Sequence, residues 1–338
     1  MSERRERYSR QMLFAPIGET GQQKLTEKSV LVVGVGALGT VIANHLVRAG
    51  VGHVRLVDRD YVEQSNLQRQ MLFDEEDVSQ ALPKAVAAER KLRQINSEIN
   101  VEGIVVDVTK DNISDLMKGM DIVVDGTDNF SARFLLNDAC YMAGIPFVYG
   151  GAVASRGMTA MLIPGLTPCL RCLVPEASEA GETCDRVGVL SPVVDMAASL
   201  QTIEVIKYLV DAEESYRNKL LTFDMWENRF FEIAFTKPRP DCPTCQQNQY
   251  PAMKAESTLA VSLCGRETIQ IHEKGSFELE EWAEQLSKAG KVKKTSFLLR
   301  VELPEGERLV LFPDGRVLVQ GTEEMARAKS LYARYIGM

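Results

Sequence analysis

The sequence predicts an α/β protein with a doubly wound, Rossmann-like and mainly parallel sheet, followed by a small α+β unit. Two observations support this prediction. Over residues 1–245, short β-branched runs alternate with segments of helical periodicity, which is typical of βαβ units with helices on both faces of a parallel sheet. Beyond residue 256 the order changes to a strand, a helix, three strands and a final helix, which indicates a separate unit.

The first βαβ unit lies between residues 30 and 58. The apolar run Val30–Val33 predicts a buried strand, glycines in GxGxxG spacing follow at 34–39, and Thr40–Ala49 predicts a helix. A second strand, Val54–Val57, ends at Asp58. In a nucleotide site the glycines let the backbone approach phosphates, and an acid at this position accepts hydrogen bonds from ribose hydroxyls. The stretch therefore predicts a nucleotide site without identifying the nucleotide.

The remaining elements of the first domain follow in order. Residues 1–28 predict one or two short helices outside the sheet, and the polar stretch after Asp58 predicts a loop over the strand ends. Ser191 before Pro192 predicts a capped helix start, and the strand over 159–163 is expected to run antiparallel to its neighbours. The predicted helices cover 84–95, 111–118, 130–143 and 191–210, and the predicted strands cover 103–106, 122–125, 147–150, 159–163, 220–223 and 230–235.

The domain limits follow from a change of composition. Residues 1–245 are expected to form the first domain, and the polar segment 246–256 a linker. Residues 257–338 are expected to form the small α+β domain. Its predicted strands cover 268–271, 296–303, 308–312 and 316–319, and its predicted helices cover 279–288 and 323–335.

The composition is that of an ordinary globular chain. Of 338 residues 45% are hydrophobic and 25% are charged, and the formal net charge of −8 argues against a general nucleic-acid-binding protein. No apolar run approaches the roughly 20 residues that span a bilayer, and the charged N-terminus does not resemble a secretory signal. We therefore expect a cytoplasmic protein that binds neither nucleic acid nor a membrane.

Four of the seven cysteines form two CxxC pairs, Cys169/Cys172 and Cys242/Cys245. Four thiolates from two such pairs make a closed tetrahedral site that suits structural zinc. Redox-active thiols, or a chance pattern, are the alternatives, but no strand–CxxC–helix context favours thioredoxin-like chemistry. We expect a zinc ion that joins the irregular segment before residue 190 to the end of the first domain.

Cationic and polar side chains cluster beyond the second strand, in the loop Ser65–Gln70 together with Lys84. A hydride-transferring enzyme does not need this cluster, whereas an enzyme that handles a triphosphate needs Arg and Lys to offset phosphate charge. The alternative is a solvated surface. Asp128 follows the strand over 122–125, where open α/β sheets bind ligands, and beside a triphosphate it is a candidate Mg²⁺ ligand. Its alternative role is to cap the next helix.

Cys184 lies in the irregular segment before the helix at 191. Its thiolate is a candidate nucleophile that takes over an activated acyl group. Against this role, no histidine lies next to it in the sequence. The residues alone leave both interpretations, thiol relay and idle cysteine, open.

Taken together, these motifs resemble the ThiF/MoeB/HesA family, whose members adenylylate ubiquitin-like proteins and are related to the ubiquitin-activating enzymes. The resemblance covers roughly residues 5–245, and the C-terminal unit is similar to the extension of Bacillus-type members. It rests on RYSRQ at 7–11, VGVGALG at 33–39, VDRDYVEQSNLQRQ at 57–70, PK at 83–84, GTDNF at 126–130, the two CxxC pairs, LCGRETIQI at 263–271 and LFPDGRVLVQGT at 311–322.

The resemblance implies a set of site residues. Those implied to surround ATP and Mg²⁺ are Gly36, Ala37, Asp58, Ser65, Asn66, Leu67, Gln68, Arg69, Lys84, Asp128 and Asn129. Arg10 is implied to reach the γ-phosphate from the neighbouring subunit of a homodimer, and Asp128 to hold Mg²⁺. The four CxxC cysteines are implied to hold zinc. Cys184 aligns with a cysteine that some relatives use for acyl transfer and others do not need.

The expected activity is therefore ATP-dependent adenylylation of the C-terminal Gly-Gly carboxylate of a ThiS- or MoaD-type sulfur carrier protein, for thiamine or molybdopterin synthesis. Such a carboxylate is ionised at neutral pH and needs no general base, which agrees with a chain that has only three histidines. An NAD(P)-dependent Rossmann oxidoreductase is the first alternative, and it leaves the loop at 65–70 unexplained. A non-catalytic nucleotide-binding scaffold is the second.

Overall fold

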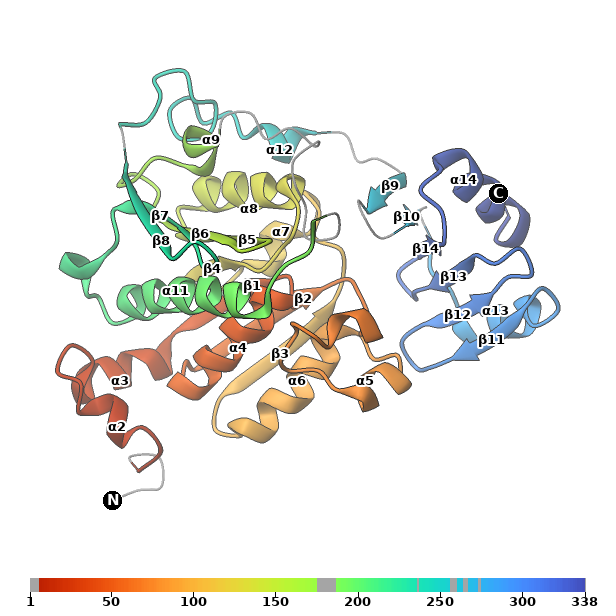
Figure 1. Cartoon of the computed structure of the whole chain (residues 1–338), viewed down its shortest axis with the longest axis horizontal. Helices are drawn as coiled ribbons and strands as arrows, with labels where there is room; N and C mark the ends of the chain where they lie inside the picture. Colours follow the sequence, from red (N-terminus) through yellow and green to blue (C-terminus); the bar gives the residue numbers. More distant parts are fainter. Residues whose placement is uncertain are drawn as a thin grey trace. The chain divides into compact units, whose positions relative to one another are not determined.

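A computed structural model describes residues 6–174, 187–235, 237–255, 260–263, 267–272 and 275–337. The chain divides into two compact units, Met1–Ala255 and Glu256–Met338, which are described separately (Figure 1). None of the helices in these ranges is long and apolar enough to cross a bilayer.

The first unit is built on an eight-stranded sheet in the order β3-β2-β1-β4-β5-β6-β7-β8. The first five strands of this order run parallel, and the last three are added antiparallel, each to its neighbour. The predicted doubly wound sheet and the antiparallel β6 are both confirmed. The strands are β1 (Ser29–Val33), β2 (His53–Asp58), β3 (Asn100–Val105), β4 (Ile122–Asp125), β5 (Phe147–Val153), β6 (Arg156–Leu162), β7 (Lys219–Asp224) and β8 (Arg229–Ala234).

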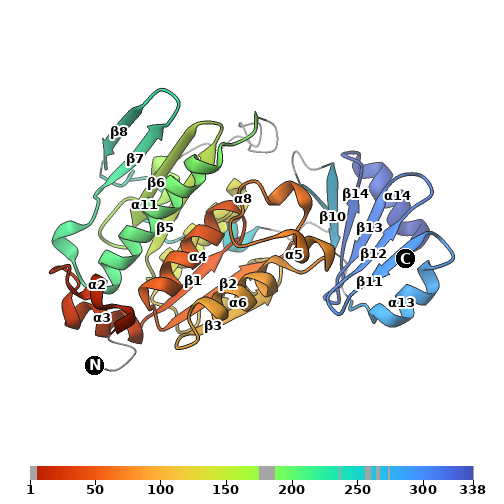
Figure 2. The ribbon, with the colours of Figure 1, turned by 60° about the horizontal axis from the view of Figure 1, so that its bottom comes forward.

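Helices cover both faces of this sheet. On one face α4 packs against α6 and α11, and on the other face α8 packs against β4, β5, α7, α9 and α12 (Figures 1 and 2). The helices are α2 (Ser9–Met12), α3 (Gly18–Glu27), α4 (Ala37–Ala49), α5 (Glu75–Ser79), α6 (Lys84–Ile95), α7 (Ile113–Leu116), α8 (Phe130–Ala143), α9 (Leu170–Leu173), α11 (Ser191–Leu209) and α12 (Pro251–Lys254), with 3₁₀ turns η1 (Gln64–Asn66) and η2 (Glu213–Ser215).

The parallel strands are central because they are apolar on both faces. Leu31, Val123 and Phe147 face α8 and are fully buried in one core cluster. Burial of such a side chain stabilises the fold by roughly 1.5–3 kcal/mol, and parallel strands covered on both faces are expected to be continuously apolar. The core thus holds the carboxyl ends of β1, β2 and β4 side by side.

Several elements of this unit differ from the prediction, among them α9, which was not predicted, and α4, which begins at Ala37 and not at Thr40. Helix α5 was not predicted; it begins after Asp74, whose side chain accepts the backbone amides of Glu76 and Asp77 as an N-cap. Ser191 is the first helical residue of α11 rather than its cap, which is Leu190. Helix α12 lies inside the segment predicted as a linker and packs against α8.

The second unit is a six-stranded antiparallel sheet in the order β11-β12-β13-β14-β10-β9 with two helices. The predicted α+β class is confirmed, while β9 and β11 were not predicted. Ile269, Ile271, Val317 and Val319 alternate along β10 and β14 and form a core cluster with side chains of both helices. The elements are β9 (Ala260–Leu263), β10 (Thr268–His272), α13 (Leu279–Leu286), β11 (Lys291–Lys294), β12 (Leu299–Glu302), β13 (Arg308–Leu311), β14 (Arg316–Gln320) and α14 (Met325–Tyr335).

Candidate functional site

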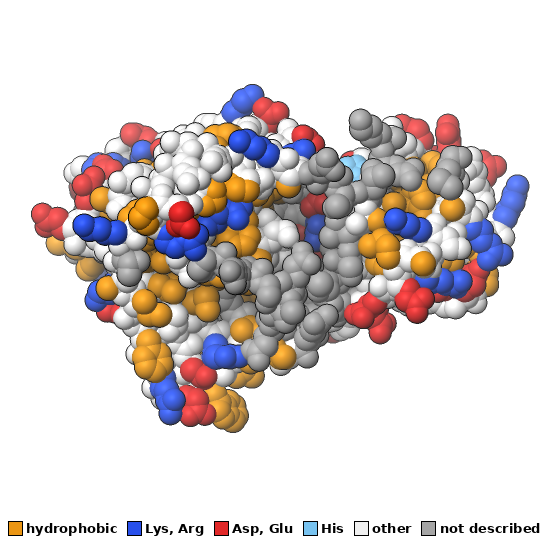
Figure 3. All heavy atoms as spheres, turned by 90° about the horizontal axis from the view of Figure 1, so that it is seen from above, with side chains coloured by type: hydrophobic (Ala, Val, Ile, Leu, Met, Phe, Trp, Pro, Cys, Tyr) orange, Lys and Arg blue, Asp and Glu red, His pale blue; other side chains and the backbone are white. Residues whose placement is uncertain are grey.

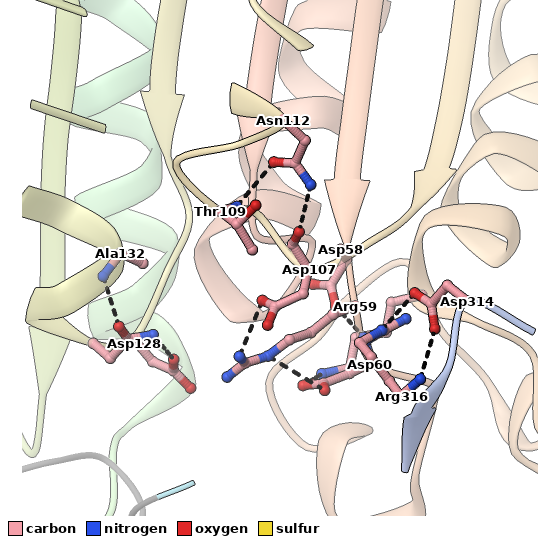
Figure 4. A network of polar contacts seen from close by, with 12 residues as sticks. Asp58, Arg59, Asp60, Asp107, Thr109, Asn112, Asp128, Ala132, Asp314 and Arg316 are labelled. Carbon is pink, nitrogen blue, oxygen red and sulfur yellow. Dashed lines mark hydrogen bonds and ion pairs between the residues drawn. The ribbon is translucent and has the colours of Figure 1, made fainter. Parts of the chain in front are cut away.

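The candidate nucleotide site lies at the carboxyl edge of the parallel strands. Parallel strands end on the same side of a sheet, which is where open α/β sheets bind ligands. Strand β2 ends at Asp58, and β4 ends at Asp125, three residues before Asp128. Figure 4 shows Asp58, Asp60 and Asp128 together at these strand ends.

The glycine turn between β1 and α4 combines a tight contact with an open space. Gly34 has φ +87°, and a Cβ on it would lie 2.7 Å from the carbonyl of Gly126, while a Cβ on Gly39 would lie 1.9 Å from the carbonyl of Gly34. No side chain fits at either position. A Cβ on Gly36 would meet only Gln70 Nε2, at 3.8 Å. Because no side chain of the described residues caps α4, its first amides face this space and favour an anion.

Asp58 is a rigidly held acid at the end of β2. The Val35 amide donates to Asp58 Oδ2 over 2.6 Å, and the Asp60 amide donates to Asp58 Oδ1 over 2.7 Å. Burial raises the pKa of Asp58, and the nearby Lys84 charge opposes that rise. Each carboxylate oxygen keeps a second lone pair, so the predicted role of accepting ribose hydroxyls is compatible with this geometry.

Lys84 is more enclosed than the sequence suggested. It opens α6, its side chain is only 4% exposed, and Nζ lies 3.4 Å from Asp60 Oδ2. The backbone is tied at the same point, because the Lys84 amide donates to the Asp60 carbonyl over 2.9 Å. Lys84 therefore lies against the carboxylate of Asp60, two residues beyond the end of β2.

The SNLQR loop is folded around a buried asparagine. Asn66 Oδ1 accepts the Glu63 amide over 3.1 Å and closes η1 as part of a capping box. Arg69 Nη1 donates to the Ser65 carbonyl over 2.9 Å. Asn66 thus shapes the loop, and Arg69 is held one turn further on. The remaining motif residues are the half-buried Leu67 and the exposed Gln68.

Gln70 belongs to this site and was not among the predicted site residues. Its side chain is buried, and Oε1 has no hydrogen-bond partner among the described residues. Its amide group lies beside Gly36. The nitrogen Nε2, and not Oε1, is the atom nearest the Gly36 space, so this amide group can donate a hydrogen bond to an anionic ligand there. The sequence signal was its place as the last residue of SNLQRQ.

The loop that carries Asp128 is fixed by its neighbours. Asn129 Oδ1 accepts the Ala132 amide over 2.8 Å and caps α8, so the alternative role of Asp128 as the cap is wrong. The fully buried Asp125 accepts the Thr127 amide over 2.8 Å and the Thr127 hydroxyl over 2.7 Å. Burial raises the pKa of Asp125. The exposed Asp128 is thus presented from a turn that is held on both sides.

Arg133 of α8 completes this turn and was missed by sequence reasoning. Arg133 Nε lies 3.1 Å from Asp125 Oδ2, and Nη2 donates to the carbonyls of Thr127 over 2.8 Å and Gly150 over 3.1 Å. The guanidinium also lies over the ring of Tyr149. The only signal in the sequence was an arginine in the first turn of the helix that begins after GTDN.

Arg10 lies far from this site in its own chain. The next residue, Gln11, donates from Nε2 to the carbonyl of Ala49 over 3.0 Å, at the last turn of α4. Helix α4 has 13 residues and is therefore about 20 Å long, with Gly36 at its other end. The exposed Arg10 cannot reach the Gly36 space of the same chain.

The two CxxC pairs come together as a four-cysteine centre. Cys169 Sγ lies 3.5 Å from Cys242 Sγ, Cys172 Sγ lies 3.5 Å from Cys245 Sγ, and all four sulfurs lie within 4.8 Å of one another. Tetrahedral zinc with Zn–S bonds of about 2.3 Å requires sulfurs about 3.8 Å apart, so this donor set fits zinc. Cys184 lies outside the described residues.

Comparison with known proteins places this geometry in one family. The ThiF family model matches residues 8–244. The sulfur carrier protein ThiS adenylyltransferase of Bacillus subtilis is 47% identical over 98% of this chain and 99% of its own length. The sulfur carrier protein adenylyltransferase of Thermus thermophilus is 37% identical over 71% of this chain and 90% of its own. The crystal structure of E. coli MccB with ATP superposes with a TM-score of 0.62 and 26% identity, over 71% of this chain and 74% of that chain.

Proposed function

The chain belongs to the ThiF family, and from this premise we infer that it is an ATP-dependent adenylyltransferase of a ubiquitin-like sulfur carrier protein. It transfers AMP to the C-terminal Gly-Gly carboxylate of the carrier and releases pyrophosphate. The names of two relatives support the activity, and the MccB structure with ATP supports the nucleotide. These relatives do not favour the NAD(P)-dependent oxidoreductase alternative. The cytoplasmic location remains a prediction.

The observation that carries this proposal is the open space at Gly36. It is lined by the first amides of α4 and by the buried Gln70, and it lies at the strand edge that also holds Asp58 and Asp128. The amides would bind phosphate oxygens and Asp58 the ribose. A triphosphate bound at Gly36 would leave the outer side of the site open for the C-terminal tail of the carrier.

The reaction needs alignment and charge compensation more than proton transfer. The carrier carboxylate has a pKa of about 3.5 and is already a nucleophile at neutral pH. Its attack on the α-phosphorus breaks the bond to the bridging oxygen, and the electron pair leaves with pyrophosphate. Arg69 and Lys84 would offset the negative charge that develops there, and positioning of the carboxylate would supply much of the remaining acceleration.

Magnesium is the second ligand that the residues suit. Mg²⁺ prefers carboxylate and phosphate oxygens and keeps several waters, and Asp128 presents an exposed carboxylate from a fixed turn at the strand edge. Bound Mg²⁺ would neutralise phosphate charge. Asn129 is occupied as the cap of α8, so Asp128 is the proposed ligand of the two.

The position of Arg10 supports a homodimer in which each subunit completes the site of the other. Arg10 is exposed at the far end of α4 from Gly36, and Leu13 and Phe14 beside it are exposed apolar side chains. A second copy that covers this segment would bury the apolar pair and bring Arg10 to a nucleotide. Mixing the R10A and D128A variants should restore exchange activity in the heterodimer, because one of its two sites then has both residues. Failure to restore it would rule out this arrangement.

The edge strand β8 is the proposed docking surface for the carrier. Trp226, Phe230, Phe231 and Ile233 are each more than half exposed on β8 and its turn, and Figure 3 shows hydrophobic side chains on the side of the first unit where β7 and β8 lie in Figure 1. Strand β7 runs in the same direction as β5, so the turn after it lies at the carboxyl edge. A carrier seated on the hairpin would have its tail directed along the edge of the nucleotide site.

This surface has a direct test. The F231E variant should raise the KM for the carrier at least about tenfold and leave the KM for ATP unchanged. L166E places the same charge on another exposed apolar residue, beyond the end of β6 and at the opposite sheet edge, and should change neither constant. An unchanged carrier KM in F231E would remove β8 from the docking surface.

A ThiS-type carrier, and hence the thiamine pathway, is the preferred partner over a MoaD-type carrier. The B. subtilis relative named for ThiS matches both units of this chain, whereas the T. thermophilus relative covers 71% of it. ATP–pyrophosphate exchange should appear when a ThiS-type carrier with a terminal Gly-Gly is added and should vanish when the last glycine is removed. Exchange that is faster with a MoaD-type carrier would reverse the choice of partner, and no exchange with either would overturn the proposed activity.

A further inference from the structure

One buried carboxylate lies between the two CxxC segments. Asp138 of α8 is fully buried, and its two oxygens accept hydrogen bonds from three separate segments. Arg171, inside the first CxxC, donates from Nε over 3.0 Å and from Nη2 over 2.8 Å. Thr244, inside the second CxxC, donates from Oγ1 over 2.6 Å, and the Ala252 amide of α12 donates over 2.8 Å. The two CxxC segments are more than 70 residues apart in sequence.

The neighbour of this carboxylate strengthens the same junction. Asn137 Oδ1 accepts the amide of Leu170, which follows the first ligand cysteine, over 2.8 Å, and its Nδ2 donates to Asp138 Oδ1 over 3.0 Å. The Arg171 guanidinium lies 4.4 Å from the centre of the Phe134 ring, one turn earlier on α8. The first CxxC is therefore held by α8 at the backbone as well as at the side chain.

We propose that Asp138 is a positioning residue for the zinc centre, because it fixes both CxxC segments and α12 in the arrangement that binds the metal. A buried ionised carboxylate is tolerated only when its lone pairs are satisfied, and here the donors are the residues between the ligand pairs. Each Sγ–Sγ contact of the centre joins one CxxC to the other, so the relative position of the two segments decides the affinity. Residues that orient metal ligands typically change metal affinity 10- to 100-fold when they are replaced.

The experiment compares the rate of zinc release to a chromogenic chelator from the zinc-loaded full chain. D138N should release zinc about 10- to 100-fold faster than the original sequence. T244V removes one hydrogen bond at constant shape and should give a smaller acceleration, and T244S, which keeps the hydroxyl, should restore the original rate. Rates within about twofold of the original in both D138N and T244V would overturn the proposal.

A matched control separates this role from the general cost of losing a buried carboxylate. Glu204 of α11 is equally buried and accepts the Lys207 ammonium over 2.7 Å and the Arg217 amide over 2.8 Å, away from the cysteines. E204Q should leave zinc release unchanged, and an acceleration equal to that of D138N would overturn the proposal. If D138N does not fold, the difference between T244V and T244S decides the outcome.

The link to α12 gives a second readout that does not involve the metal. Lys254 is exposed at the end of α12, and trypsin cleaves after lysine. Zinc-loaded D138N should be cut after Lys254 faster than the original sequence, because it lacks the carboxylate that holds the Ala252 amide. Equal cleavage rates would show that Asp138 does not anchor α12.

Discussion

Two buried aspartate–arginine pairs each include one residue of α8, and they serve opposite kinds of site. Asp125 pairs with Arg133 and fixes the turn that presents Asp128. Asp138 pairs with Arg171 and fixes the cysteine segments. Both carboxylates are fully buried. The first pair supports a turn whose Asp128 carboxylate is exposed beside an open space. The second pair makes its hydrogen bonds to other groups inside the protein.

The difference separates a site that a ligand completes from a site that is already closed. At the nucleotide edge, Gly36 faces open space and Gln70 Oε1 has no partner among the described residues. At the cysteine centre, four sulfurs face one another within 4.8 Å. Changes to the exposed groups of the first site, such as Asp128, should therefore reduce activity more than stability, and changes at the second site should reduce stability more than activity.

The largest effect is expected at Asp128. D128A removes the proposed Mg²⁺ ligand and should reduce ATP–pyrophosphate exchange roughly a hundred- to a thousandfold, because phosphate charge is then poorly compensated. The melting temperature should remain close to that of the original chain, since Asp128 is exposed. D115A, at an exposed aspartate of α7 paired only with Lys118 among the described residues, is the control and should retain activity. Activity of D128A equal to that of D115A would remove Asp128 from the site.

The next largest effect is expected when the first ion pair is broken. Arg133 is 9% exposed and Asp125 is fully buried, so R133M leaves a buried carboxylate without its cation and should lower the free energy of unfolding by about 3–5 kcal/mol. Urea unfolding measures this loss. Exchange activity should fall as well, because the Asp128 turn loses its support. A loss below about 1 kcal/mol would show that the pair is not the anchor of the turn.

A smaller loss is expected for the second pair. Arg171 is 19% exposed, so solvent screens its charge, and Asp138 keeps its other donors in R171M. We expect a loss of about 1–3 kcal/mol in urea unfolding, with exchange activity nearly unchanged while zinc is bound. A loss of exchange as large as that of R133M would contradict the separation of the two sites.

The N-cap of α5 shows what the loss of a polar group costs in stability when that group belongs to neither site. D74A should cost about 1 kcal/mol, measured by urea unfolding at neutral pH. The hydrogen bond from Lys91 holds the pKa of Asp74 below its usual value, so this stability is present above the unfolded pKa and is lost as the pH falls through the folded pKa. D74N keeps a capping oxygen without the charge and should remove the pH dependence. An equal pH dependence in D74N would assign it to another group.

No effect on adenylation is expected at Cys184. C184A should leave ATP–pyrophosphate exchange at the original rate, because the acyl-adenylate forms before any thiol takes over the acyl group. Lost exchange would show that Cys184 acts in the first step.

Strongly patterned elements could be predicted from the sequence to the residue. The bounds of β4, α6 and α8 agree with the predicted ranges, because apolar periodicity and breakers mark both ends. Elements without such a pattern were missed. Strand β11 has three lysines and one partly buried valine, and α12 is a single turn within a polar segment.

The site was predictable where local motifs carry it. The cysteine pairs predicted the cluster because CxxC spacing is itself the geometry of a metal site. The roles of Arg133 and Asp138 could not be predicted. They depend on hydrogen bonds to strand β5 and to a residue more than 30 positions away. The unexpected enclosure of Lys84 arises from Asp60, whose position depends on how the loop after β2 folds.

The most direct test of the account follows the phosphates of ATP onto the carrier. With a Gly-Gly carrier and ATP labelled at the α-phosphate, the label should appear on the carrier as a covalent AMP, and D128A should prevent its transfer. With ATP labelled at the γ-phosphate, the label should appear in pyrophosphate alone. Label from the γ-phosphate on the carrier, or transfer of the α-label to a carrier that lacks its last glycine, would contradict adenylylation of the terminal carboxylate.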